Sequence, residues 1–119
     1  MKNKITYILL IMLIVGCVPP TMYYWGDYSN TLYKYKKDVT PEMLEKHKTE
    51  LLNILSKSNE LGLRVPPGIN AELGYIFLLQ EQNEQANLYL EKEKLTYPES
   101  TKFIDDLLQN INKGNQNEY

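Results

Sequence analysis

Two helix-forming segments lie on either side of a short break near Asn83, and this spacing constrains the fold more than any other feature. The apolar periodicity predicts one helix from about Ile69 to Gln82 and another over about residues 84–96, which Pro98 ends. Two helices joined by so short a turn must run antiparallel and pack face to face. The sequence therefore predicts a helical hairpin.

Residues within this hairpin resemble a tetratricopeptide repeat, a helix-turn-helix unit of about 34 residues. The positions that agree with the repeat in register are Leu73, Gly74, Phe77, Ala86, Leu90 and Pro98. Two positions depart from it, because Asn70 replaces a large aromatic residue and Glu93 replaces a small one. Gly74 and Ala86 fit together physically, since helices that cross closely need small side chains at the contact. The resemblance implies a repeat-like helical hairpin.

A long helix is expected before the hairpin. In Thr40-Pro41-Glu42, a threonine can act as N-cap, proline can occupy the first helical position and an acid follows in the first turn. This helix is expected to run to Leu61 and to stop at Gly62, and Pro66 and Pro67 then break the chain. Its expected core face is formed by Leu44, Leu51, Ile54, Leu55 and Leu61.

Shorter helices are expected at both ends of the domain. The first covers about residues 29–37 with Ser29 or Asn30 as its cap, and the last begins at a cap on Ser100. The apolar face expected for the last helix comprises Phe103, Ile104, Leu107, Leu108 and Ile111. We therefore predict an all-α fold, a tetratricopeptide-like hairpin within a small array of about four to five helices.

Size and charge exclude several functions. The chain has 119 residues and a net charge of −2, with 13 basic and 15 acidic residues. This is one domain with little room for the deep cleft of a large enzyme. No basic excess remains to neutralise phosphates, so we expect no nucleic-acid partner.

The N-terminus predicts secretion and a lipid anchor. Lys2 and Lys4 precede an apolar run, residues 5–15, that is shorter than the roughly 20 residues of a spanning helix. The following residues resemble the lipobox of bacterial lipoproteins, Ile14-Val15-Gly16-Cys17. The resemblance implies cleavage between Gly16 and Cys17 and attachment of a diacylglyceryl group and an N-acyl chain to Cys17. The alternative is an ordinary signal peptide or a short anchor with an incidental cysteine.

Cys17 is the only cysteine, so no intramolecular disulfide can form, and lipidation would remove a free thiol. Val18 follows it instead of Asp, which in enteric lipoproteins implies sorting to the outer membrane. The expected organisation is a signal peptide over residues 1–16, a lipidated tether over 17–23, a helical domain over 24–113 and a polar tail over 114–119. The protein is then expected in the cell envelope, facing the periplasm.

Aromatic residues are concentrated before the first long helix. This segment is either a binding surface or a set of rings that closes the end of a small core. We take it, together with one face of the helix from Ile69, as the candidate partner contact. The candidate residues are Tyr24, Trp25, Tyr28, Tyr75, Leu79 and Gln82.

The sequence predicts no catalysis, no cofactor and no metal. His47 lies on the edge of a helix face with no second histidine, so a structural role is expected. Asp105 and Asp106 are adjacent on a helix and point about 100° apart, so they cannot share one substrate. The run from Glu91 to Lys94 is expected to be a solvated face. Surface charge is likewise expected for Glu72, Glu81 and Glu84.

The whole mature chain also resembles a family of small proteobacterial lipoproteins of unknown function. The shared motifs are WGDY-x-x-x-LY-x-Y over residues 25–35, VPPG over 65–68, E-x-GY over 72–75 and the block over 90–100 that ends in YPES. Members are typically encoded beside a lipoprotein similar to the curli-secretion protein CsgG. The resemblance implies a non-enzymatic interaction or assembly factor in the outer membrane. The alternatives are a regulator or enzyme acting on the cell wall or on an envelope ligand, and a purely structural surface lipoprotein.

Overall fold

The described part of the chain is helical throughout. The computed structural model describes the backbone of residues 20–116 and the side chains of residues 20–109. It contains a short 3-10 turn (Pro98–Ser100) and the α-helices α2 (Tyr28–Lys37), α3 (Pro41–Glu60), α4 (Ile69–Leu79), α5 (Asn83–Thr96) and α6 (Thr101–Gln116). Residues 20–116 contain no strand, so the predicted all-α class is confirmed.

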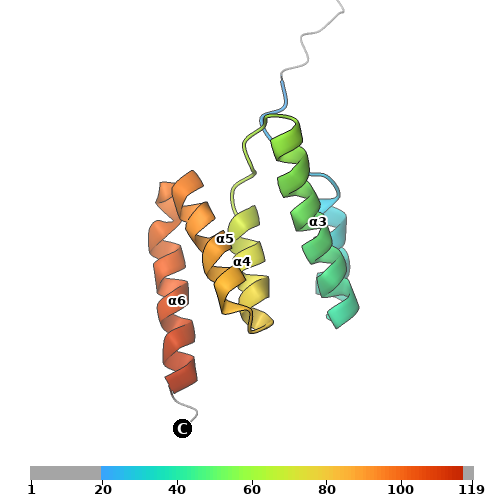
Figure 1. Cartoon of the computed structure of the whole chain (residues 1–119). Coiled ribbons are helices and arrows are strands. Elements are labelled where there is room, and N and C mark those ends of the chain that lie inside the picture. Colours follow the sequence, from blue (N-terminus) through green and yellow to red (C-terminus); the bar gives the residue numbers. More distant parts are fainter. Residues whose placement is uncertain (1–19, 117–119) are drawn as a thin grey trace, which may run out of the picture.

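The helices form two successive hairpins followed by α6. Helix α2 packs along α3, and α4 packs along α5, while α6 follows the 3-10 turn and lies beside α5 (Figure 1). The α4–α5 hairpin is the one that the sequence predicts. The α2–α3 hairpin is an addition, because the sequence indicates both helices but not their pairing. The array of helices fits the tetratricopeptide resemblance, which itself stays a prediction.

The start of α3 agrees with the sequence, whereas that of α2 is one residue earlier than expected. Thr40 caps α3, since its Oγ1 accepts the backbone N–H of Met43 at 3.3 Å. The N-cap of α2 is Asp27 and not Ser29 or Asn30, because the Asp27 carbonyl already accepts the N–H of Thr31 at 3.1 Å.

The turn between α4 and α5 also differs from the prediction. Asn83 is the first residue of α5 and not the turn, which consists of residues 80–82. Glu81 has a φ of 59°, and the N–H of Gln82 donates to the carbonyl of Phe77 at 2.9 Å. This is the hydrogen-bond pattern that closes a helix after a left-handed residue. Glycine is usual at such a position. Because Glu81 occupies it here, the sequence gives no signal for this turn.

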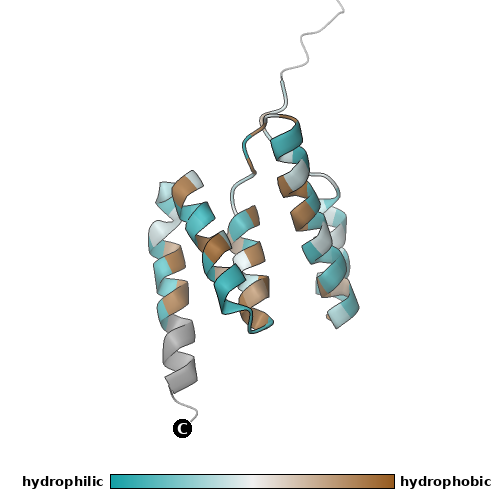
Figure 2. Cartoon of the chain, in the orientation of Figure 1, coloured by the Kyte–Doolittle hydropathy of each residue, from teal (hydrophilic) through white to brown (hydrophobic). Residues whose placement is uncertain are grey.

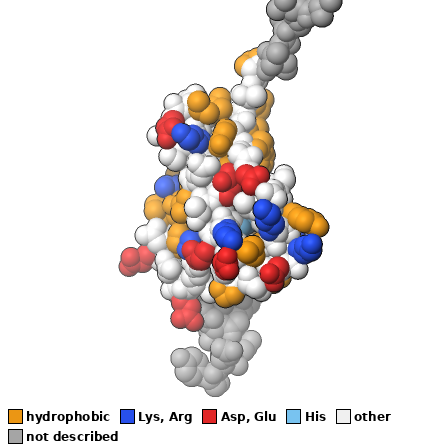
Figure 3. Space-filling view, turned by 90° about the vertical axis from the view of Figure 1, so that its right-hand side faces the viewer, with side chains coloured by type: hydrophobic (Ala, Val, Ile, Leu, Met, Phe, Trp, Pro, Cys, Tyr) orange, Lys and Arg blue, Asp and Glu red, His pale blue; other side chains and the backbone are white. Residues whose placement is uncertain are grey.

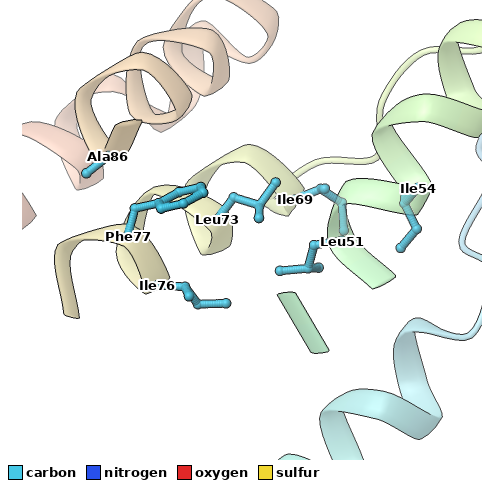
Figure 4. Packing of buried hydrophobic residues seen from close by; sticks show 7 residues of the cluster. All are labelled: Leu51, Ile54, Ile69, Leu73, Ile76, Phe77 and Ala86. Atoms are coloured by element: carbon cyan, nitrogen blue, oxygen red, sulfur yellow. The ribbon is translucent and has the colours of Figure 1, made fainter. Parts of the chain in front are cut away.

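The core lies between α3, α4 and α5. Its buried hydrophobic residues are Leu51, Ile54, Ile69, Leu73, Ile76, Phe77 and Ala86 (Figure 4). Hydrophobic residues are concentrated on α4 and on the side of α3 that faces it (Figure 2). The packing of α4 on α5 requires glycine at position 74, because a Cβ there would lie 2.6 Å from Cγ of Leu90 and 3.1 Å from the carbonyl oxygen of Ala86.

Some predicted core residues lie on the surface. Leu61 is 57% exposed, because α3 ends at Glu60 and the chain turns away from the core face. Phe103 is 64% exposed, although its neighbour Ile104 is completely buried. The remaining expected residues of α3, Leu44 and Leu55, are partly buried against the core.

Glu93 is buried and contacts the start of α4, so the predicted solvated face is wrong at this residue. Its side chain is 2% exposed, and Oε1 accepts the backbone N–H of Gly68 at 2.8 Å. A carboxylate at a helix N-terminus satisfies a free N–H group and interacts favourably with the helix dipole. Glu93 therefore joins the end of α5 to the start of α4. The tetratricopeptide repeat has a small, closely packed residue at this position. Here the hydrogen bond from Gly68 to Glu93 takes the place of that packing.

Candidate functional site

A hydrogen-bonded network around His47 connects three helices. His47 on α3 is 1% exposed. Its Nδ1 lies 2.8 Å from Oγ1 of Thr31 on α2, and its Nε2 lies 2.9 Å from Oε1 of Glu72 on α4. The hydroxyl of Tyr28 donates to the other carboxylate oxygen of Glu72 at 2.9 Å. The network therefore holds both hairpins together, and the prediction that Glu72 is only a surface charge is wrong.

The protons of this network follow from the hydrogen-bonding capacity of each group. An ionised carboxylate only accepts, so Nε2 of His47 donates to Glu72. The Thr31 hydroxyl lies 3.0 Å from the carbonyl oxygen of Tyr28, to which it donates while it accepts from a protonated Nδ1. If Nδ1 is unprotonated, the same hydroxyl can turn and donate to it. The Thr31 hydroxyl can thus serve Nδ1 of His47 either as donor or as acceptor.

The phenol of Tyr28 remains a donor over the physiological pH range. Burial of the phenol, followed by the charge of Glu72 and the hydrogen bond to it, raises the pKa of Tyr28 to about 12. The proton therefore stays on Tyr28, and the bond to Glu72 persists.

Aromatic rings surround His47. Its ring lies 5.5 Å from that of Tyr28 and is stacked at 6.4 Å on that of Tyr35, measured between centroids. The ring of Trp25 packs edge-on against Tyr28 at 5.4 Å. Of the two interpretations of the aromatic segment, closure of the core thus describes Tyr28 and Tyr35. Trp25 differs from them, since it is 42% exposed.

The order of hydroxyl, imidazole and carboxylate resembles the relay that activates a nucleophilic serine. Two features of this network differ from such a relay. The ring is reversed, because in that relay Nε2 faces the hydroxyl, whereas here Nε2 faces the carboxylate. The ring is also buried among tyrosines, so no substrate can reach its nitrogens. The geometry is that of a structural connection between helices.

The surface over α2 and α3 has no single dominant charge. Figure 3 shows Lys and Arg side chains interspersed with Asp and Glu, with hydrophobic side chains between them. Several of these charges form ion pairs within one helix, including Lys46 with Glu42 at 2.7 Å and Lys57 with Glu60 at 2.6 Å. Exposed pairs of this kind contribute little to stability.

An apolar groove lies next to the network, between the first half of α4 and α6. Its volume is about 410 Å³, and the residues that line it are Gly68, Ala71, Glu72, Tyr75, Phe103 and Leu107. Tyr75 is 45% exposed and Phe103 64%. Glu72 belongs to both features, so the groove and the His47 network share one carboxylate. Within residues 20–109, this groove is the clearest candidate for a binding surface.

One protein-family model matches the part of the chain that contains the His47 network and the apolar groove. A model of the family described as "Domain of unknown function (DUF4810)" matches residues 22–107. The chain belongs to this family. The DUF4810 region includes every residue of the His47 network and of the groove. No curated protein and no solved structure matches the chain significantly.

The six candidate contact residues occupy different places in the DUF4810 domain. Tyr75 lines the groove, and Tyr28 reaches the same region through Glu72. Tyr24 is partly buried against the core. Leu79 is 53% exposed outside the groove lining, and Gln82 lies in a separate polar hollow at the α4–α5 turn. The structure thus brings together Trp25 and Tyr28, whose rings are in contact, and Tyr75 lies one helical turn from the Glu72 to which Tyr28 donates. Leu79 and Gln82 lie elsewhere.

The remaining predictions concern the lipid anchor, membrane-spanning helices and metal sites. The proposed signal peptide, Gly16 and Cys17 lie outside the described residues. In the described part of the DUF4810 chain, no helix is long and apolar enough to cross a membrane. No group of three or more His, Cys, Asp and Glu side chains that could hold a metal ion occurs in that part either.

Proposed function

We propose that this chain is a lipid-anchored outer-membrane protein that binds another envelope lipoprotein, one similar to CsgG, and catalyses no reaction itself. The lipobox-like Ile14-Val15-Gly16-Cys17 segment supports the anchor. The motifs shared with small proteobacterial lipoproteins support the type of partner. Membership of the DUF4810 family is compatible with this role.

The observation that carries the interaction role is the set of large apolar side chains exposed on a small helical domain. Trp25, Tyr75 and Leu79 are between 42% and 53% exposed. Tyrosine and tryptophan are enriched among the residues that dominate the affinity of protein interfaces. The imidazole of His47, by contrast, is buried and has both nitrogens within hydrogen-bond distance of protein groups, which favours binding over catalysis.

Cys17→Ser should abolish lipid labelling and release the protein from membranes. The hydroxyl cannot accept the thioether-linked lipid, and two or more acyl chains are needed for stable anchoring. Metabolic labelling with a fatty-acid analogue and membrane fractionation measure both effects. Thr21→Ser, a small change a few residues away, is the control and should keep the anchor. A Cys17→Ser protein that remains labelled and membrane-bound would contradict the proposed anchor.

Trp25→Ser combined with Leu79→Ser should reduce capture of the partner lipoprotein about tenfold, the equivalent of about 1.4 kcal/mol of binding free energy. Capture is measured by crosslinking the full chain in cells and identifying the crosslinked proteins by mass. Leu88→Ser combined with Leu95→Ser is the matched control, because these leucines are exposed on α5. Membrane attachment should be unchanged in both double variants. If both double variants capture the partner equally well, Trp25 and Leu79 do not form the partner surface.

The alternative role is that of a regulator or enzyme acting on the cell wall or on a small envelope ligand. One observation favours it, because the groove volume of about 410 Å³ lies within the range of ligand pockets. Turnover of an envelope substrate by the purified full chain, lost on one polar substitution in the groove, would select this alternative.

A further inference from the structure

A protruding aromatic ring and an apolar hollow lie side by side on one face of the molecule. Phe103 on α6 is 64% exposed. Its ring forms part of the wall of the groove, which is otherwise lined by Glu72, by the small residues Gly68 and Ala71 and by the larger Tyr75 and Leu107. A hollow next to small residues can accept a large side chain. Burying a phenyl ring that is exposed to this extent is favourable in free energy, because it removes apolar surface from water. The two features therefore have complementary shapes and the same apolar character.

Opposite charges accompany the hollow and the ring. Among the residues whose side chains the structure describes, Glu72 is the one charged residue that lines the groove, and its side chain is 26% exposed. Each of its oxygens accepts one bond within the domain, from His47 and from Tyr28, so acceptor sites remain free. Lys102, next to Phe103, has a side chain that is 87% exposed. Its ammonium group donates to Asp106 at 2.6 Å and has two further protons to donate.

The carboxylate also distinguishes between possible occupants of the groove. A fatty acid or a phospholipid headgroup would bring a negative charge towards Glu72, which costs free energy in an apolar site. A phenyl ring with an ammonium group on the neighbouring residue has the chemistry that fits. On α6, Phe103 supplies the ring, and the preceding Lys102, about 100° around the helix, supplies the ammonium group at the end of a long side chain that can reach past the ring.

We infer that the groove between α4 and α6 is the interface of a symmetric dimer of this chain. A two-fold axis places Phe103 of each copy in the hollow of the other and Lys102 of each near the partner's Glu72. Such an interface is self-complementary, because each contact occurs twice. The dimer is independent of the proposed function, since it requires neither the lipid anchor nor a second kind of lipoprotein.

The mass of the full chain in solution tests this inference. The chain is purified in detergent, and its protein mass is measured by analytical ultracentrifugation over a range of concentrations. The full 119-residue chain has a mass of 13.9 kDa before any processing. The dimer should have twice the monomer mass that mass spectrometry gives for the same purified protein. We expect the dimer to be populated at about 10 µM, an ordinary affinity for a small interface.

Substitutions then locate the interface. Phe103→Asp should weaken the dimer at least about tenfold, because a carboxylate replaces the ring in an apolar hollow beside Glu72. Leu95→Asp is the matched control, since Leu95 is 81% exposed on α5. Lys102→Glu should weaken the dimer, whereas Lys46→Glu on α3 should not. Circular dichroism should show the same helix content in every variant.

Four results would overturn the inference. The first is a monomeric wild-type chain at up to about 100 µM. The second is a dimer that is insensitive to Phe103→Asp, and the third is equal weakening by Leu95→Asp. The fourth is a monomeric chain that loses its envelope partner on Phe103→Asp, which would assign the groove to that partner. The proposed function is tested separately by the Trp25 and Leu79 double variant. If that variant loses partner capture while the dimer stays intact, the inferred dimer stands.

Discussion

His47→Ala is expected to lower the free energy of unfolding by about 2 to 5 kcal/mol, the range for removing a large side chain from a core. The imidazole is 1% exposed and is bonded to both Thr31 and Glu72. Its removal leaves a cavity between Tyr28 and Tyr35 and takes a donor from a half-buried carboxylate. Urea unfolding followed by circular dichroism measures the change.

Two further variants separate packing from hydrogen bonding at this position. His47→Phe keeps an aromatic ring between the tyrosines but cannot bond to Glu72 or Thr31. Because unpaired buried polar groups cost about 1 to 3 kcal/mol each, this variant should recover only part of the loss. Lys46→Ala, on an exposed face of the same helix, should change the free energy of unfolding by less than about 0.5 kcal/mol. A loss below about 1 kcal/mol for His47→Ala would show that the network does not hold the hairpins together.

The sequence alone predicts the α4–α5 hairpin well because its signals are local. Periodic apolar residues define both helices, and the small residues Gly74 and Ala86 indicate where they cross. The start of α3 is predicted for the same reason, since a cap and a proline at the first helical position act within one turn. Its C-terminus is less certain, because Leu61 continues the apolar pattern although the helix has already ended at Glu60.

The His47 network could not be predicted, because its contacts join distant parts of the sequence. His47 and Glu72 are separated by 25 positions, and Tyr28 and Glu72 by 44. A single histidine and a single glutamate have no local pattern that distinguishes a buried pair from surface charge. The clue that was available is the position of His47 between Leu44 and Leu51, which places it close to the core face.

The groove was only partly predictable for a different reason. The spacing of Phe103 and Leu107 correctly indicates an apolar face on α6, but it does not indicate what covers that face. In the structure Ile104 is fully buried, whereas Phe103 remains exposed beside α4. The sequence of α4 alone indicates Tyr75 as a contact residue. Its neighbours across the groove depend on where the 3-10 turn directs α6.

Gly74→Ala is expected to lower the free energy of unfolding by about 1 to 3 kcal/mol, as overpacking does in other cores. Helix propensity alone would predict the opposite, because alanine is favoured over glycine by about 1 kcal/mol inside a helix. The added Cβ would lie 2.6 Å from Cγ of Leu90 and 2.7 Å from its Cδ2. Both values are too short for carbon atoms, so α4 and α5 must move apart. Urea unfolding of the variant measures the cost.

A double-mutant cycle identifies Leu90 as the cause of that cost. Leu90→Ala alone should lower the free energy of unfolding by about 2 to 5 kcal/mol, because Leu90 is completely buried. In the Leu90→Ala background, Gly74→Ala should cost much less, since the clashing atoms are gone and only the Ala86 carbonyl remains close. The coupling energy should then exceed about 1 kcal/mol, as is typical for residues in contact. The same cycle with Leu88→Ala, at an exposed position of α5, should be additive. If both cycles are additive, the crossing of α4 and α5 does not depend on glycine at position 74, and the close packing of this hairpin is contradicted.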